Sequence, residues 1–370
     1  MGHEAERRPS RRVNCGGVPI GGGAPISVQS MTNTDTRDVK STLAQIRALA
    51  DAGCQIARCA VPDSEAAQAL REIRRASPLP LVADIHFDHR LALEAIECGA
   101  DKVRINPGNI GGREAVGAVA RKAKERGVPI RVGVNSGSIE KALREKHGGA
   151  TAAAAAESAL SHIAMMESLG FEDIVVSIKL TDLRANLEAH SIVAAKTPYP
   201  FHIGVTEAGV GESGRVKSAI GVGALLLRGI GDTLRVSLTG APEAEVGLAL
   251  EILRSLGLRE GLIQVVSCPT CGRCRVSLEP IARSVQEAAR RAEKRLAGAA
   301  GAGRRPLTLA VMGCAVNGPG EAADADMGVA CGDGKGAIFM GGRIVKTVDE
   351  ADIAEELSKL LEETYYGYNT

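Results

Sequence analysis

The stretch PLVADIHFDHRLALEAIECGADKVRINPG, residues 80–108, contains one complete structural unit and the start of the next. A short apolar run, PLVADIHF, is followed by a helical pattern that ends at Gly99, and a second apolar run, DKVRINPG, begins soon after it. Glycine commonly follows the last turn of a helix. This order predicts a strand, a helix and a second strand, as in α/β proteins with parallel sheets.

The same unit recurs from residue 26 to about residue 257. The predicted strands are ISVQSM (26–31), QIARCAV (55–61), PLVADIHF (80–87), DKVRINPG (101–108), PIRVGVNSG (129–137), DIVVSIKL (173–180), PFHIGVTEAG (200–209) and TLRVSLTG (233–240). Eight strand and helix pairs match the (β/α)8 TIM barrel, which typically takes about 250 residues. An open doubly wound sheet normally has fewer strands and a Gly-rich fingerprint after the first one, and neither is found.

The pattern changes after the eighth helix, and a chain of 370 residues is too long for one average core. The second part contains the strands in LIQVVSC (262–268), LTLAVMGC (307–314), GAIFM (336–340) and RIVKTV (343–348), a long charged helix (278–297) and a final helix (349–363). We therefore predict an α/β chain with a TIM barrel at 1–257, followed by a small α+β domain at 258–370.

Composition excludes several classes of function. Lys and Arg number 45 against 44 for Asp and Glu, so no overall field attracts nucleic acid or a membrane surface. Aromatic residues make up 2% with no Trp, too few for a base-stacking platform or a membrane aromatic belt. No run of about 18 apolar residues occurs, and the basic start lacks the apolar core of a signal peptide. We expect a cytoplasmic protein.

The nine cysteines fall into two groups. Cytoplasmic proteins rarely form disulfides, and the five dispersed residues are expected to be small buried apolar side chains: Cys15, Cys54, Cys59, Cys98 and Cys331. The other four, Cys268, Cys271, Cys274 and Cys314, cluster at predicted strand ends in SCPTCGRC (267–274) and MGCAVNGPGEA (312–322). This clustering indicates a shared chemical role.

Polar residues stand near the C-terminal ends of most predicted barrel strands, where TIM barrels carry their functional groups. They are Arg58, Asp84, His86, Arg104, Asn106, Arg131, Asn135, Ser177, Lys179, Glu207 and Ser237. Residues two apart lie on the same side of a strand, so several of these side chains converge if that side is the lumen. Any one charge could belong to an internal ion pair.

The charges of this set are unbalanced, with four cations, Arg58, Arg104, Arg131 and Lys179, against the acids Asp84 and Glu207. Unpaired buried charge is costly, so the barrel mouth is predicted to bind an anion. The planar guanidinium fork suits phosphate, which favours a phosphorylated or diphosphate substrate. Glu207, a carboxylate among cations, is the best candidate for a proton donor or base.

The cysteine clusters leave the kind of metal site open. C-x-x-C serves zinc, redox dithiols and iron–sulfur clusters alike, and four thiolates would make a closed structural zinc site. Three thiolates with Glu321 would instead hold an iron–sulfur cluster in which one iron keeps an exchangeable oxygen ligand. Asn317 could then donate a hydrogen bond to a cluster sulfur or to the substrate.

Seven motifs together resemble the 4-hydroxy-3-methylbut-2-enyl diphosphate synthases of the non-mevalonate isoprenoid pathway. They are VQSMTNTDT (28–36), DIHFDHRLAL (84–93), VRINPGN (103–109), GVTEAG (204–209), RVSLTG (235–240), SCPTCGR (267–273) and GCAVNGPGEA (313–322). The resemblance covers nearly the whole chain. It implies reductive opening and dehydration of 2-C-methyl-D-erythritol 2,4-cyclodiphosphate by two electrons.

The resemblance also implies the site residues. A 4Fe-4S cluster would be held by Cys268, Cys271, Cys314 and Glu321, leaving Cys274 as a spare where the family usually has Thr. The diphosphate contacts would be Arg58, His86, Arg104, Arg131, Asn135, Lys179 and Ser237. Glu207 would act at the reacting carbon, with Glu321 and Asn317 as the other catalytic residues.

The resemblance further implies partners and a form of the enzyme. Ferredoxin or flavodoxin would donate the electrons, and a homodimer would bring one subunit's cluster domain to the other's barrel. The chain lacks room for the large extra domain of plant-type members, so a bacterial form is expected. The competing hypotheses are a non-redox barrel similar to dihydropteroate synthase with a structural zinc, and a non-enzymatic iron–sulfur binding module.

Overall fold

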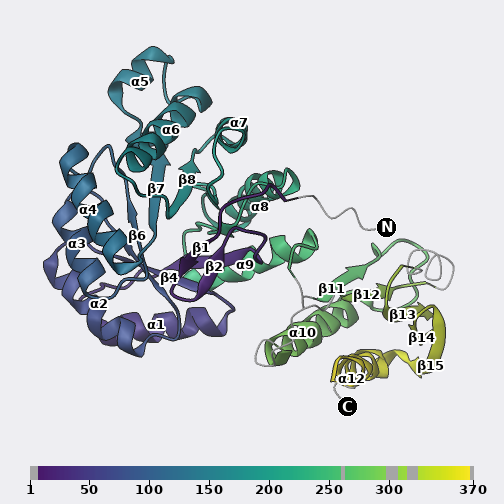
Figure 1. Cartoon of the computed structure of the whole chain (residues 1–370). Coiled ribbons are helices and arrows are strands. Elements are labelled where there is room, and N and C mark those ends of the chain that lie inside the picture. Colours follow the sequence, from purple (N-terminus) through teal and green to yellow (C-terminus); the bar gives the residue numbers. More distant parts are fainter. Residues whose placement is uncertain (1–6, 260–262, 297–306, 315–323, 367–370) are drawn as a thin grey trace. The chain divides into compact units, whose positions relative to one another are not determined.

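The computed structural model describes residues 7–259, 263–296, 307–314 and 324–366 (Figure 1). The chain divides into two compact units, Met1–Leu256 and Gly257–Thr370. The first unit is a parallel eight-stranded sheet with helices outside it, in the strand order β8-β7-β6-β5-β4-β3-β10-β9. A bridge between Val176 and Phe201 joins the two end strands, so the sheet closes on itself. The predicted TIM barrel is confirmed.

The barrel strands fall within the eight predicted runs. They are β3 (Ser27–Met31), β4 (Ile56–Ala60), β5 (Leu81–Asp84), β6 (Lys102–Ile105), β7 (Ile130–Asn135), β8 (Ile174–Lys179), β9 (His202–Ile203) and β10 (Thr233–Leu234). The helices are α1 (Val39–Asp51), α2 (Ser64–Ala76), α3 (His89–Glu97), α4 (Gly112–Arg126), α6 (Ala152–Ser168), α7 (Leu183–Ala194), α8 (Gly211–Leu227) and α9 (Pro242–Ser255). A short 3-10 turn, η1 (Ser136–Ser138), and a one-turn helix, α5 (Lys141–Lys146), precede α6.

Local sequence explains where several helices begin. The side chains of Asp38, Asp63, Thr151 and Asp182 each accept a hydrogen bond from a backbone N–H of the first turn. These N-caps satisfy donors that the helix itself leaves unpaired, and each contributes about 1 kcal/mol. The loop that ends each barrel strand therefore passes into its helix at a defined residue.

A hairpin that was not predicted closes the N-terminal end of the barrel. Strands β1 (Val13–Cys15) and β2 (Val18–Ile20) pair antiparallel, and Val13, Cys15 and Ile20 pack against Ile56, Val82 and Val175 of the barrel. Each of these barrel residues stands two positions before Arg58, Asp84 or Ser177, so the latter three lie on the same side of their strands. That side is the lumen.

The shortest barrel strands, β9 and β10, are held at their base by Asp232. Its Oδ2 accepts a hydrogen bond of 2.8 Å from the backbone N–H of Phe201. Its Oδ1 accepts from Ser10 Oγ at 2.9 Å and lies 3.1 Å from Arg7 Nη2. The segment that precedes the hairpin thus supports the part of the barrel with the fewest ladder hydrogen bonds.

The second unit is a five-stranded mixed sheet in the order β11-β12-β13-β14-β15. Its elements are β11 (Ile263–Ser267), α10 (Leu278–Leu296), β12 (Leu307–Met312), β13 (Met327–Gly332), β14 (Lys335–Met340), β15 (Arg343–Asp349), η2 (Glu350–Asp352) and α12 (Ile353–Tyr366). Apolar side chains of α10 and α12 join those of four strands in one core. The predicted α+β character is confirmed, although β13 was not predicted. Among the described segments, no helix combines the length and apolar character needed to cross a bilayer.

Candidate active site

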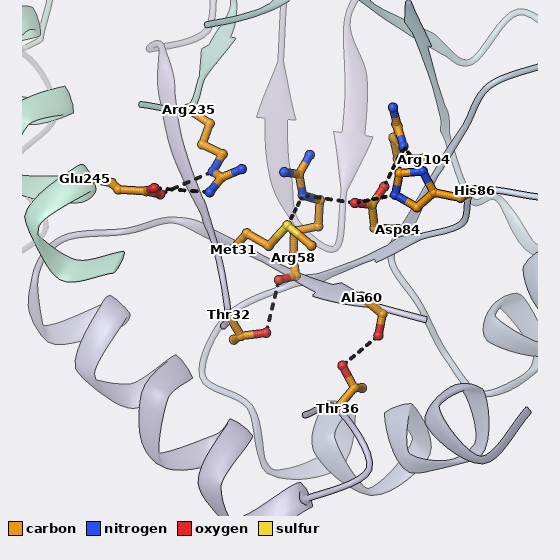
Figure 2. Close-up of polar contacts among 10 residues, drawn as sticks. All are labelled: Met31, Thr32, Thr36, Arg58, Ala60, Asp84, His86, Arg104, Arg235 and Glu245. Carbon is orange, nitrogen blue, oxygen red and sulfur yellow. Dashed lines mark hydrogen bonds and ion pairs between the residues drawn. The ribbon is translucent and has the colours of Figure 1, made fainter. Parts of the chain in front are cut away.

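The centre of the candidate site is a buried ion cluster in the barrel lumen (Figure 2). Arg104 Nη1 lies 3.1 Å from Asp84 Oδ1, and Arg58 Nε lies 3.8 Å from Asp84 Oδ2. All three side chains are at most 6% exposed. The Arg58 Nε–H also points to Met31 Sδ at 3.1 Å. Register brings the three together, because Asp84 of β5 pairs with Arg104 of β6, and Arg58 of β4 pairs with Val82, two residues before Asp84 on the same side of β5.

The charges determine the protonation state of this cluster. Burial alone would raise the pKa of Asp84, but Arg58, His86 and Arg104 together lower it far below its ordinary value. Burial lowers the pKa of Arg58 to about 10, and the attraction of Asp84 offsets only part of that loss. Asp84 is therefore ionised, and its single carboxylate forms ion pairs with both guanidinium groups.

Arg131 and Lys179 add two more cations to the lumen. Both are buried, and burial together with the neighbouring guanidinium groups lowers the pKa of each well below its usual value. Arg131 pairs in register with Arg104 of the next strand. In the described part of the barrel, the buried carboxylates besides Asp84 are Asp232 and Glu245, which pair with Arg7 and Arg235. The predicted charge imbalance is present in the structure.

Gly204 makes room for Lys179. A Cβ at Gly204 would lie 2.8 Å from Lys179 Nζ and 2.5 Å from the backbone oxygen of Arg235. Both separations are shorter than real side-chain contacts allow. The glycine after β9 is thus required because the lysine side chain and the adjacent backbone approach this strand closely.

The other predicted substrate-binding residues lie around these cations. His86 is 56% exposed at the outer edge, with its Nε2 3.5 Å from Asp84 Oδ2. Asn135 is the last residue of β7 and pairs in register with Lys179. Asn106 and Ser177 are buried, and Ser237 is half-buried after β10. The loops that follow β9 and β10 are joined by a hydrogen bond of 3.3 Å between Thr239 N and Gly209 O.

Glu207 stands in the loop after β9, where its side chain is exposed. Its Oε2 accepts a hydrogen bond of 3.1 Å from Thr181 Oγ1, and its backbone has φ +53°. Non-glycine residues rarely adopt this left-handed conformation, which is found most often at functional loops. The hydrogen bond from Thr181, which follows β8, therefore orients the side chain of Glu207, the predicted proton donor.

The clustered cysteines come from the ends of two adjacent parallel strands. β11 pairs with β12, and Cys268 and Cys314 follow them. The backbone N–H of Gly313 donates to Cys268 Sγ at 3.2 Å, and a hydrogen bond from the backbone N–H of Arg273 lowers the pKa of Cys271. N–H groups directed at sulfur and a lowered thiol pKa suit thiolate ligands of a metal or cluster.

The remaining metal-site predictions are only partly covered by the described residues. Asn317 and Glu321 lie outside them. Within the part of the chain that is described, no three His, Cys, Asp or Glu side chains are already arranged around one metal position. Cys274 Sγ points to the backbone oxygen of Val276 at 3.3 Å and packs beside Gly313. The dispersed cysteines are all buried, as predicted.

Two family models match this chain. The GcpE TIM-barrel domain matches residues 10–250, and the GcpE protein C-terminal domain matches residues 264–363. The chain belongs to the GcpE family. The resemblance drawn from the seven motifs is thereby confirmed, and it favours the synthase reading over a phosphate-handling barrel with a structural zinc.

Members of the GcpE family match along nearly the whole chain. A protein of Geobacter sulfurreducens is 54% identical over 360 residues, covering 96% of this chain and 99% of its own. A protein of Caldanaerobacter subterraneus is 51% identical over 356 residues, covering 96% and 97%. Both are named 4-hydroxy-3-methylbut-2-en-1-yl diphosphate synthase (flavodoxin). Dihydropteroate synthase from Xanthomonas albilineans, a solved structure, is 15% identical with a TM-score of 0.46 over 65% of this chain and 97% of its own.

Some lumen residues of this GcpE barrel were missed from the sequence. Arg235 forms an ion pair with Glu245 of α9, with nitrogen–oxygen distances of 3.2 and 3.1 Å (Figure 2). Lys102 and His202 are fully buried in β6 and β9. Lys102 precedes Arg104 by two positions, as Arg235 precedes Ser237. Extending the two-residue spacing one step toward the strand start would have identified both.

Proposed function

We propose that this GcpE-family chain opens and reduces 2-C-methyl-D-erythritol 2,4-cyclodiphosphate to 4-hydroxy-3-methylbut-2-enyl diphosphate. Two electrons and a proton enter, the carbon–oxygen bond that closes the ring breaks, and one hydroxyl leaves as water. The barrel, residues 1–257, would bind the substrate, and residues 258–370 would hold the redox centre. The relatives' names support this product.

The charge imbalance of the lumen is the observation that carries the proposal. Four buried cations, Arg58, Arg104, Arg131 and Lys179, surround one ionised carboxylate, Asp84. Ring opening converts a bridging phosphate into a terminal one and adds a negative charge. The cations therefore stabilise the opened diphosphate more than the cyclic substrate, which lowers the barrier to opening.

Three further polar side chains would place the substrate within this field. His86, Asn135 and Ser237 stand at or beyond the strand ends, where they can donate to phosphate oxygens or to hydroxyl groups. Glu207, oriented by Thr181, would supply the proton at the reacting carbon. Holding donor and substrate in fixed positions supplies part of the rate enhancement.

Cys268, Cys271 and Cys314, with Glu321, would hold a 4Fe-4S cluster, and Asn317 would lie beside it. The residues fit such a group, because Cys268 and Cys314 follow two adjacent parallel strands, β11 and β12. The backbone N–H of Gly313 also donates a hydrogen bond to Cys268 Sγ. The cluster, once bound, would supply electrons one at a time. Cys274 would not be a ligand, since its sulfur already contacts Val276 O.

Two partners complete the proposal. Flavodoxin would donate the electrons, as the relatives' names indicate for those proteins; ferredoxin is the alternative donor. The cations and the cysteines belong to different units of the chain, so a homodimer in which one subunit's cluster domain covers the other's barrel would bring them together. Sedimentation of active enzyme as a monomer would contradict the dimer.

The test is anaerobic purification with iron, acid-labile sulfide and turnover measured on one sample. We expect about four irons and four sulfides per chain, together with conversion of the cyclic diphosphate by reduced flavodoxin. A colourless protein with zinc and no sulfide would contradict the proposal. An Arg58→Met variant serves as the matched control, because it should retain the cluster while losing substrate affinity.

A further inference from the structure

A further buried cation, Lys102, lies beneath the cations of the mouth. Lys102 begins β6, pairs in register with Val82, and stands two residues before Arg104 on the same side of the strand. Its side chain is fully buried. Nζ makes no hydrogen bond to any group in the described ranges of the chain. An amine that is inaccessible and unbonded is costly, because it loses water without gaining a partner.

Lys102 is not the only buried polar residue of the barrel that lacks hydrogen-bond partners among the described residues. Other buried polar atoms also lack hydrogen bonds to the described protein groups: both amide atoms of Gln29, Nε and Nη1 of Arg131, and both ring nitrogens of His202. TIM barrels usually fill these positions with branched apolar side chains. Buried polar groups without partners lower the stability of the free protein, which implies that they serve binding.

The groups around Lys102 do not neutralise it. Burial, together with the positive charges of Arg131 and Arg58, lowers the pKa of Lys102 to about 8. Cys15 of the hairpin acts in the opposite direction, but burial raises the pKa of that thiol, so it is neutral at pH 7. The ammonium group of Lys102 is thus repelled by the same guanidinium groups that face the mouth.

We propose that Lys102 supports substrate binding from the base of the lumen, adding its charge to the field of Arg131 and Arg58 so that a bound diphosphate relieves their mutual repulsion. This inference rests on the proposed function, because it assigns an additional supporting residue to the same site. Lys102 acts through the two arginines, so it is a positioning residue and not a catalytic one.

A purely structural role makes a different prediction. If Lys102 only fills space with its aliphatic stem, methionine should replace it with no effect on anion binding. If it contributes charge, Lys102→Met should raise the melting temperature of the ligand-free protein and weaken diphosphate binding at the same time. Opposite effects on stability and affinity are typical of residues retained for function.

The experiment measures binding by calorimetry at pH 7, without an electron donor so that no turnover occurs. The ligands are 2-C-methyl-D-erythritol 2,4-cyclodiphosphate and, separately, inorganic pyrophosphate. We expect Lys102→Met to weaken both about fivefold, the effect of one charge acting at a distance through protein. Lys196→Met, which removes an exposed lysine after α7, is the matched control and should bind like wild type.

A pH series provides a second readout. As pH rises from 7 to 9 the free protein loses the proton of Lys102, so wild-type affinity should fall more steeply than that of Lys102→Met. Lys179 and the ligand titrate equally in both proteins, so the difference between the two profiles isolates Lys102. Parallel profiles, or affinities within twofold at pH 7, would overturn the inference. Lys102→Gln repeats the test if the methionine variant does not fold.

These outcomes separate this inference from the proposed function. Failure of the wild-type protein to bind the cyclic diphosphate would refute the proposed function itself. Tight binding by wild type together with unchanged binding by Lys102→Met would refute only the role of Lys102.

Discussion

Thr181 Oγ1 donates a hydrogen bond of 3.1 Å to Glu207 Oε2, linking the loops that follow β8 and β9. Glu207 also holds a left-handed backbone conformation with φ +53°, which costs about 1 kcal/mol or more in a residue other than glycine. The side chain is exposed, so packing does not restrain it. The hydroxyl of Thr181 therefore determines where the carboxylate points.

Removing this hydroxyl should impair proton transfer without preventing binding. We expect Thr181→Val to lower kcat about tenfold, because a misdirected donor loses much of its advantage, while KM changes less than twofold. Thr181→Ser, which keeps the hydroxyl, should recover most of the rate. A valine variant with unchanged kcat and an unchanged pH–rate profile would show that Thr181 does not orient Glu207.

Asp84 should make the fold sensitive to acid. Its pKa is lowered on folding because Arg58, His86 and Arg104 outweigh the effect of burial, so its contribution is complete above the unfolded pKa of about 3.9. That contribution is lost as pH falls below this value. Asp84→Asn should therefore lower the free energy of unfolding at pH 7 by about 3 kcal/mol, since it leaves buried guanidinium groups unpaired.

The comparison for Asp84→Asn is a denaturant titration at pH 7 and at pH 3. We expect the difference in free energy of unfolding between wild type and variant to be smaller at pH 3 than at pH 7. A difference in free energy of unfolding that stays constant would mean that folding does not lower the pKa of Asp84. Asp63→Asn, at an exposed N-cap, provides a control substitution of the same chemistry.

Gly204 should tolerate no side chain. Gly204→Ala places a methyl group 2.8 Å from Lys179 Nζ and 2.5 Å from the Arg235 backbone oxygen, so we expect a loss of about 2 kcal/mol of stability. Substrate affinity should fall as well, because Lys179 must move. Gly223→Ala, in α8 with open space around it, should be neutral or slightly stabilising in the same thermal unfolding measurement.

Cys274 should be dispensable for the cluster. Its sulfur contacts the Val276 oxygen and packs beside Gly313, so Cys274→Ser is expected to keep full iron and sulfide content with a stability loss of about 1 kcal/mol. Cys268→Ser, in the same loop, should lose the cluster. A colourless Cys274→Ser protein would reverse the ligand assignment.

Glu321 should matter both for holding the cluster and for turnover. We expect Glu321→Ala to lower iron content and abolish conversion of the cyclic diphosphate, while the circular dichroism spectrum stays the same. Glu321→Asp keeps the carboxylate and should retain part of the iron. Full iron content in the alanine variant would exclude Glu321 as a ligand.

Much of the barrel could be predicted because its signals are local. Each strand of the barrel is a short apolar run, and several helices have a capping residue of their own, as Asp38 caps α1. The convergence of Arg58, Asp84 and Arg104 was also predictable, since residues at equivalent ends of parallel strands meet in the lumen. The position of each of these residues along its strand was therefore enough to predict that they meet.

Other features depend on contacts between distant residues and could not be predicted. β13 reads MGVACG, a run of small residues with weak strand preference that pairs only because β12 and β14 lie on either side of it. The hairpin β1–β2 is two strands of three residues, too short to signal its burial. Lys102 differs from these features, because its two-residue spacing from Arg104 marks the side of the strand on which it lies, although a lysine at a strand start normally reaches solvent.

The hairpin that packs under Ile56, Val82 and Val175 closes the N-terminal end of the barrel, so access to the lumen is at the C-terminal ends of the strands. Whatever reaches the cations must enter, and afterwards depart, through the rim formed by the strand ends. The product must consequently leave through the same opening by which the next substrate enters. Slow product release would therefore limit the turnover number, however fast the chemical step became.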